Sequence, residues 1–157
     1  MAVKRQPFSK ARAAVILLAV LCGGCAAAPA GERSSRPQLP VTAAARAAGE
    51  AAGIQVTALH ISAAGRIVDF RFRVVDAGKA AGVLGRQTEA YAVDQKTGAR
   101  LPVPRAGKVG ALRQTTSAAV AGKIYYILFA NTDRVVKPGS LLTVVLGDLR
   151  LADLPVQ

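Results

Sequence analysis

Few residues in this 157-residue chain have the chemistry to make or break bonds. Nucleophilic catalysis needs a nucleophile, a base and a group that orients the base. The only histidine is His60, which lies in an apolar run where alternation places it on one face with Val56 and Ala58. Both cysteines, Cys22 and Cys25, lie in the N-terminal leader, and no Gly-x-Ser-x-Gly elbow is present. We therefore expect His60 to be structural and the protein not to be an enzyme.

The sequence offers equally little for metal or nucleotide chemistry. Transition-metal sites need several His, Cys or Met side chains, and the chain after Cys25 supplies His60 alone. Its acidic residues are scattered, and Gly122-Lys123 lacks the rest of a phosphate-loop motif. We expect no metal and no cofactor. Asp69 lies two residues from Arg71 on one strand face, which predicts a surface ion pair rather than a catalytic carboxylate.

The one cluster with ligand-binding chemistry is basic. Residues 100–123 carry five basic side chains and no acidic one, and residues 105–116 add glycines and hydroxyls. Basic side chains with exposed backbone N–H groups can hold a phosphate or a carboxylate. The candidate anion-binding residues are Arg105, Lys108 and Arg113 of this loop, with Arg71 and Arg73 of a nearby strand. The alternative is a solvated connecting loop. The absence of aromatic residues from the loop argues against nucleic acid.

The N-terminal residues have the anatomy of an export signal. Four basic residues and no acidic one precede nine apolar residues, 13–21, a run too short to span a bilayer. Gly23-Gly24-Cys25 follows. This resembles the lipobox of bacterial lipoproteins, which implies that Cys25 is acylated and becomes the new N-terminus. Cys22 departs from the lipobox, which prefers Leu at that position. Cys22 fits less well as the acylated residue itself, because the bulky Leu21 would precede the cut.

The lipobox resemblance implies a protein held at a membrane by its acyl chains and facing the periplasm. Ala26 follows the cysteine, and in enteric-type sorting a residue other than Asp there implies the outer membrane. Two alternatives stay open. Ordinary signal peptidase cleavage after Ala30 would give a soluble periplasmic protein. The uncharged stretch 13–30 would otherwise remain as an anchor, although its glycines and proline weaken it as a helix.

The composition divides the chain into a signal peptide (1–24), an acylated tether and linker (25–53) and a folded domain (54–157). The linker is rich in Ala, Pro, Gly and Ser, a composition that cannot bury a core. Within it, Thr42 is the expected N-cap of a short, marginal helix. A domain of about 100 residues can fold without disulfides or metals.

Hydrophobic alternation predicts seven strands, at residues 54–62, 66–76, 89–94, 99–103, 123–131, 141–146 and 149–156. The clearest is 66–76, where the apolar residues face one way and Asp69, Arg71 and Arg73 face the other. The run 123–131 is apolar on both faces and predicts a central strand. Residues 79–84 predict either one helical turn or an irregular crossover, and residues 105–122 predict a long loop. Strands of this number and spacing predict an immunoglobulin-like antiparallel β-sandwich, with a small barrel as the alternative.

The net charge of the chain and its resemblance to other exported proteins indicate a general kind of partner and no particular function. The chain carries 21 basic and nine acidic residues, a net charge of +12, which favours acidic partners unless the charge only solvates the surface. Segments such as DFRFRVVD (69–76) and YYILFAN (125–131) resemble a group of small exported bacterial proteins of uncharacterised function. That resemblance implies a folded domain and no mechanism. We expect a non-catalytic envelope lipoprotein that binds an unknown protein partner or serves as an accessory subunit. The alternative is an anionic ligand, such as a glycan, lipopolysaccharide or a phosphate group, bound through the 100–123 loop.

Overall fold

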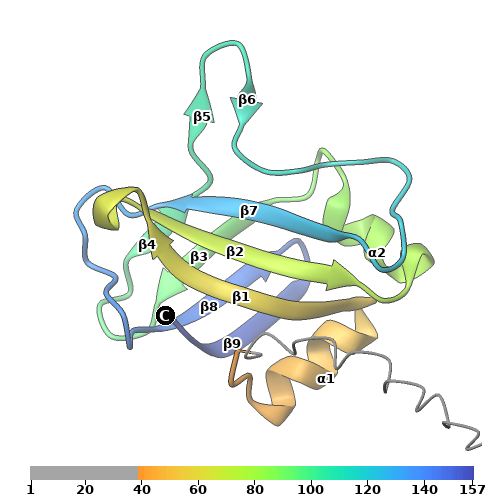
Figure 1. Cartoon of the computed structure of the whole chain (residues 1–157), viewed down its shortest axis with the longest axis horizontal. Helices are drawn as coiled ribbons and strands as arrows, with labels where there is room; N and C mark the ends of the chain where they lie inside the picture. The colour runs from red at the N-terminus through yellow and green to blue at the C-terminus, as the bar shows by residue number, and fades with distance from the viewer. Residues whose placement is uncertain (1–38) are drawn as a thin grey trace, which may run out of the picture. The chain divides into compact units, whose positions relative to one another are not determined.

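The alternating residues around Phe70 form the middle strand of the first sheet. In the computed structural model, which describes residues 39–157, β2 (Ile67–Val74) pairs with β1 (Ile54–Ser62) on one side and β7 (Ile124–Ala130) on the other (Figure 1). Both pairings are antiparallel. Cys22, Cys25 and Ala30, with the leader and most of the linker, lie outside the described residues.

The second sheet has four antiparallel strands in the order β4 (Arg100–Pro102), β3 (Ala90–Asp94), β8 (Leu141–Leu146) and β9 (Leu149–Pro155). Gly147 and Asp148 form the tight turn between β8 and β9, and Gly147 has a φ of +60° that suits glycine. Pro102, which has no N–H to donate, lies in an edge strand.

The arrangement confirms the predicted antiparallel β-sandwich. If the seven longer strands are numbered along the chain, the two sheets read 1-2-5 and 4-3-6-7. An immunoglobulin constant domain reads 1-2-5-4 and 3-6-7. The two arrangements therefore differ only in the fourth strand, here β4, which has moved to the other sheet.

The sheets enclose one apolar core built around three phenylalanines. Phe70, Phe72 and Phe129 are fully buried, and the ring centroid of Phe70 lies 5.6 Å from that of Phe72 and 6.4 Å from that of Phe129. Aliphatic side chains from the second sheet, among them Leu142 and Leu154, complete the core. These three rings are the largest fully buried side chains of the described residues.

Helix α1 (Ala43–Ala51) packs against the sandwich, although its sequence lies in the predicted linker. Thr42 is its N-cap, as expected: the Thr42 Oγ1 accepts a hydrogen bond from the Ala45 N–H at 3.2 Å. A Cβ at Gly49 would lie 2.9 Å from the Ile54 carbonyl oxygen, so the missing side chain allows the helix to approach β1. Leu39 is 4% exposed and belongs to the core, so the packed domain already includes Leu39.

Two segments between the predicted strands, 79–84 (a helical turn or a crossover) and the loop 105–122, contain ordered elements. Residues 77–84 form helix α2 (Ala77–Leu84), which is capped by the Asp76 side chain. The predicted loop 105–122 contains a two-stranded ribbon, β5 (Arg105–Ala106) and β6 (Gly110–Ala111), which projects from the body (Figure 1). Neither α1 nor α2, the α-helices of the described residues, is long and apolar enough to cross a membrane.

The prediction that β7 is a central strand is wrong, because β7 is the last of the three strands in its sheet. Its outer edge is met by the short segment 112–114. There the Leu128 N–H donates to the Leu112 carbonyl at 3.0 Å, and the Gln114 N–H donates to the Tyr126 carbonyl at 3.0 Å. Some of the backbone N–H and C=O groups on the outer edge of β7 therefore already have hydrogen-bond partners, which limits the ability of this edge to pair with another chain.

A β-bulge in β1 overturns the predicted facing of His60. Val56 pairs with Phe72, and Ala58 pairs with the very next residue of β2, Arg71, so Thr57 is the extra residue. Val56 is buried on the core side, whereas Ala58 and His60 lie on the opposite face of the sheet. Unbroken alternation predicts all three residues on one face, because it assumes that the strand has no bulge.

A buried asparagine ties two distant turns together. Asn131 is 1% exposed, and its Nδ2 donates to the carbonyls of Gly65 and Val136, each at 2.8 Å. Its Oδ1 accepts from the Val136 N–H at 3.1 Å. Gly65 ends the one-turn helix η1 (Ala63–Gly65) that joins β1 to β2. Asn131 thus fixes the β1–β2 turn to the loop that follows β7.

Candidate binding surface

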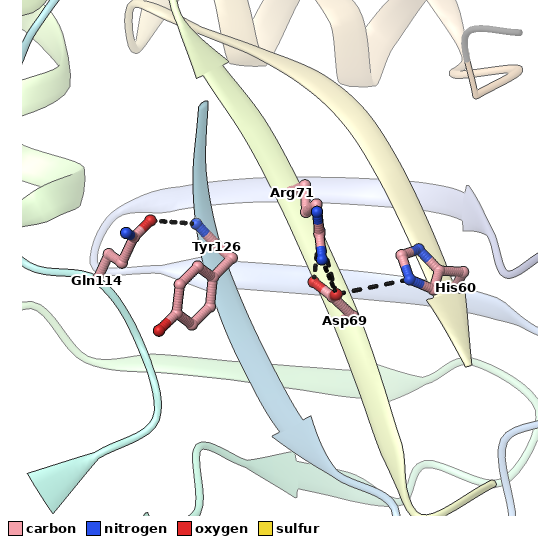
Figure 2. Close-up of polar contacts among 5 residues, drawn as sticks. All are labelled: His60, Asp69, Arg71, Gln114 and Tyr126. Carbon is pink, nitrogen blue, oxygen red and sulfur yellow. Dashed lines mark hydrogen bonds and ion pairs between the residues drawn. The ribbon is translucent and has the colours of Figure 1, made fainter. Parts of the chain in front are cut away.

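The outer face of the β1–β2–β7 sheet collects polar and aromatic side chains from all three strands. Figure 2 shows them as a row across the sheet, with His60 on β1, Asp69 and Arg71 on β2, and Tyr126 on β7. Gln114 extends the row beyond β7. We call these five residues the outer-face row. The register of the three strands places His60, Asp69, Arg71 and Tyr126 on one face, and Gln114 lies beside Tyr126, from whose N–H it accepts a hydrogen bond.

Asp69 is the centre of the row and is only 6% exposed although it faces away from the core. The Arg71 guanidinium donates to both carboxylate oxygens, from Nη2 to Oδ2 at 2.8 Å and from Nε to Oδ1 at 3.2 Å. The His60 Nε2 lies 3.5 Å from Asp69 Oδ2. The hydrogen bonds between Arg71 and Asp69, together with the negative charge of Asp69, raise the pKa of Arg71 above its ordinary value. The predicted Asp69–Arg71 ion pair is therefore confirmed, and it holds the Arg71 guanidinium in one position.

Strand β7 adds apolar side chains to the same face. Tyr126 is 39% exposed and is the direct cross-strand partner of Arg71, while Ile124 is 41% exposed and is the partner of Arg73. Gln114 fixes the backbone beside Tyr126, because its Oε1 accepts from the Tyr126 N–H at 3.2 Å. The face therefore combines exposed apolar side chains with an arginine that is already positioned.

Three of the five predicted anion-binding residues donate hydrogen bonds within the domain. Arg71 binds Asp69, and the Arg73 Nη1 donates to the Gly122 carbonyl at 2.8 Å. The Arg113 Nη2 donates to the carbonyls of Gly85 and Arg86, each at 3.0 Å, just beyond the end of α2. Partial burial lowers the pKa of Arg113.

The five residues do not gather in one place. Arg71 and Arg73 share the outer face, whereas Arg113 bridges to Ile127, which faces the core, and so lies on the other side of the sheet. Arg105 and Lys108 are on the projecting β5–β6 ribbon, away from the face. The five candidate residues thus lie in three different surroundings, of which the acid-free loop supplies two.

Sequence reasoning missed Ile124 and Tyr126 as surface residues, although their signal was present. Residues 123–131 are apolar on both faces, a pattern that predicts burial on both sides. One of those faces is instead the exposed outer face of the sheet. An apolar second face can mark either a covered strand or an uncovered contact surface, and alternation alone does not separate the two.

Other concave or ligating features in residues 39–157 point to no particular ligand. An open depression of about 380 Å³ lies between α2 and the β8–β9 turn, and its lining mixes Lys79 with Glu89 and Asp148. Within the described part of the chain, no three His, Cys, Asp or Glu side chains lie close enough together to hold a metal ion.

Replacing Arg71 with alanine is expected to lower the free energy of unfolding by about 0.5–1 kcal/mol, measured by urea denaturation. The substitution leaves the nearly buried Asp69 carboxylate with only the His60 contact. The effect stays small because the Arg71 side chain is half exposed and solvent screens the pair. Arg150→Ala, an exposed arginine on β9, is the control; equal stability of the two variants would show that the ion pair contributes nothing.

Comparison with protein-family models, with curated proteins and with solved structures finds no match to this chain.

Proposed function

We propose that this protein is a non-catalytic lipoprotein of the cell envelope whose β-sandwich binds a protein partner through the outer face of the β1–β2–β7 sheet. The observation that supports the binding surface is the exposed pair Ile124 and Tyr126 beside Arg71, which Asp69 already holds in place. Tyrosine and arginine are, with tryptophan, the residues that most often dominate binding energy at protein interfaces.

The rigidity of this face favours binding as well. An arginine fixed by a carboxylate loses less conformational freedom when a partner docks, and so more of the contact energy is kept as affinity. The backbone of Tyr126 is held on both sides, by β2 and by the segment that contains Gln114. The face is a preformed sheet surface rather than a loop that must order itself.

The outer face is tested with a photo-crosslinking amino acid placed at Tyr126 in cells that make the protein. We expect a discrete crosslinked protein band that is absent when the same group replaces Arg150, which is exposed on β9 of the other sheet. Arg71→Ala should weaken the band at Tyr126. Equal bands from both positions, or a band at Arg150 alone, would contradict the assignment of the face.

The membrane tether is supported by the Gly23-Gly24-Cys25 sequence and by the basic and apolar residues before it. Cys25→Ser is expected to abolish palmitate labelling and to leave precursor or soluble protein, whereas Cys22→Ser should keep the label. We place the protein at the outer membrane, on its periplasmic side, because Ala26 follows the cysteine. Persistent labelling of the Cys25→Ser protein would overturn the tether, and a mature protein beginning after Ala30 would identify the soluble periplasmic alternative.

An anionic ligand is the second candidate partner, because residues 95–132 contain no acidic side chain and six basic ones. Binding of lipopolysaccharide or of an anionic glycan at low salt, weakened by Arg105→Ala and Lys108→Ala, would support it. Arg113→Ala serves as a comparison, because Arg113 already donates to backbone carbonyls. Failure to bind any anionic ligand at low salt would rule this candidate out.

A further inference from the structure

The β5–β6 ribbon forms a short finger, residues 105–111, that projects beyond β7 (Figure 1). Its tip is a tight turn closed by a hydrogen bond from the Val109 N–H to the Ala106 carbonyl at 2.8 Å. Gly110 follows with a φ of +81°, the left-handed conformation that such a hairpin requires after the turn. Lys108 therefore lies at the very tip of the finger.

The base of the finger is anchored to the sandwich. The Leu112 N–H donates to the Pro104 carbonyl at 2.9 Å, which closes the ribbon at its foot. The Leu112 carbonyl accepts a hydrogen bond from the Leu128 N–H of β7. The Arg113 side chain donates hydrogen bonds to the carbonyls of Gly85 and Arg86, just after α2. The finger is thus carried on the edge of the first sheet in a fixed position.

The side chains of the finger are basic and apolar, and they face solvent. Val109 is 79% exposed, the highest value among the large apolar side chains of residues 39–157. Arg105 and Lys108 are also exposed. The nearest acidic residues in the sequence are Asp94 and Asp133, so no acidic side chain next to the finger in the sequence balances the charges of Arg105 and Lys108.

We propose that this finger touches the anionic headgroup layer of a phospholipid bilayer. Basic side chains are attracted to anionic lipids, and an exposed aliphatic side chain beside them can enter the headgroup boundary. Two cations and one valine are too few to hold a free protein at a membrane. The inference therefore rests on the proposed tether, which keeps the domain near a bilayer and makes the contact intramolecular.

The length of chain before the domain permits this contact. Thirteen residues separate Cys25 from Leu39, and fully extended they would span at most about 45–50 Å. A domain of this size has a diameter of roughly 35 Å. Leu39 lies beside residues of α1 and β1, and α1 lies across the body from the finger (Figure 1). The tether is long enough for the domain to turn its finger towards the bilayer.

The test uses the full lipidated chain in vesicles of phosphatidylcholine, with or without phosphatidylglycerol. Residues 39–157 contain no cysteine, so Val109→Cys can be labelled with an environment-sensitive fluorophore. We expect a headgroup-bound nitroxide to quench the fluorophore only when phosphatidylglycerol is present, and added salt to relieve the quenching. Asp148→Cys, in the exposed β8–β9 turn, is the matched control position and should not be quenched.

Arg105→Ala with Lys108→Ala should lower the contact equilibrium by about 25-fold, since each basic side chain near an anionic leaflet contributes about a fivefold preference. A protein that floats with both vesicle types but shows no phosphatidylglycerol-dependent quenching would overturn the finger contact and leave the tether intact. A protein that does not float would overturn the tether. A change in the fluorophore's emission with soluble polyphosphate that equals the change with phosphatidylglycerol vesicles would show a polyanion site instead of a bilayer contact.

Discussion

Replacing Phe70 with alanine is expected to lower the free energy of unfolding by about 3–5 kcal/mol. Phe70 is fully buried in the middle strand of the first sheet, and its ring packs against the rings of Phe72 and Phe129. The substitution removes the apolar area of the ring and leaves a cavity that the surrounding strands can close only in part. Because single domains are stable by about 5–15 kcal/mol, this one change should shift a urea or thermal unfolding curve by a large amount.

Tyr126→Ala is the matched control for the Phe70 variant. It also removes an aromatic ring from this sheet, but from a side chain that is 39% exposed on the outer face. We expect its free energy of unfolding to change by less than about 1 kcal/mol. Equal losses at the two positions would contradict the division of the sheet into a core face and a binding face.

The second large effect is expected at Asn131, where alanine should lower the free energy of unfolding by about 2–4 kcal/mol. The change removes three hydrogen bonds at once and leaves the carbonyls of Gly65 and Val136 without the donor they have now. Buried polar groups that lose their partners keep the full penalty of desolvation. Thermal unfolding followed by circular dichroism measures the loss.

Two further variants make the Asn131 experiment specific. Asn131→Asp keeps an acceptor for the Val136 N–H but turns the donor into an oxygen that faces two carbonyls, and so it should be at least as destabilising as alanine. Thr132→Ala changes the exposed neighbour and should have little effect. An Asn131→Asp protein as stable as the unsubstituted chain would show that the two donated hydrogen bonds contribute nothing.

The parts of the fold that depend on local alternation were predictable. The strand around Phe70 alternates without interruption, and its apolar and charged faces lie as the pattern indicates. Asp69 and Arg71 are two residues apart on one strand, so their ion pair was readable from spacing alone. Thr42 was readable as a helix cap for the same reason, because its partner is only three residues away.

The parts that depend on distant partners were not predictable. Asn131 reads as a turn residue, yet one of its acceptors, Gly65, is 66 residues away in the chain. Arg113 reads as a loop cation available to a ligand, yet its acceptors follow α2. The candidate surface needed the order of the strands in the sheet, since only that order places Tyr126 beside Arg71.

The extra residue in β1 acts as a change of phase within the strand. Before Thr57 the even-numbered residues Ile54 and Val56 point into the core, and after it the odd-numbered Leu59 and Ile61 do. Deleting Thr57 would change the composition very little, but it would move the core-facing side chains of one half of β1 to the outer face and the outer ones to the core. Evolution can therefore vary the identity of this residue more easily than it can remove it. A related chain should be aligned to β1 as two half-strands of fixed length, with the outer-face histidine in the second half.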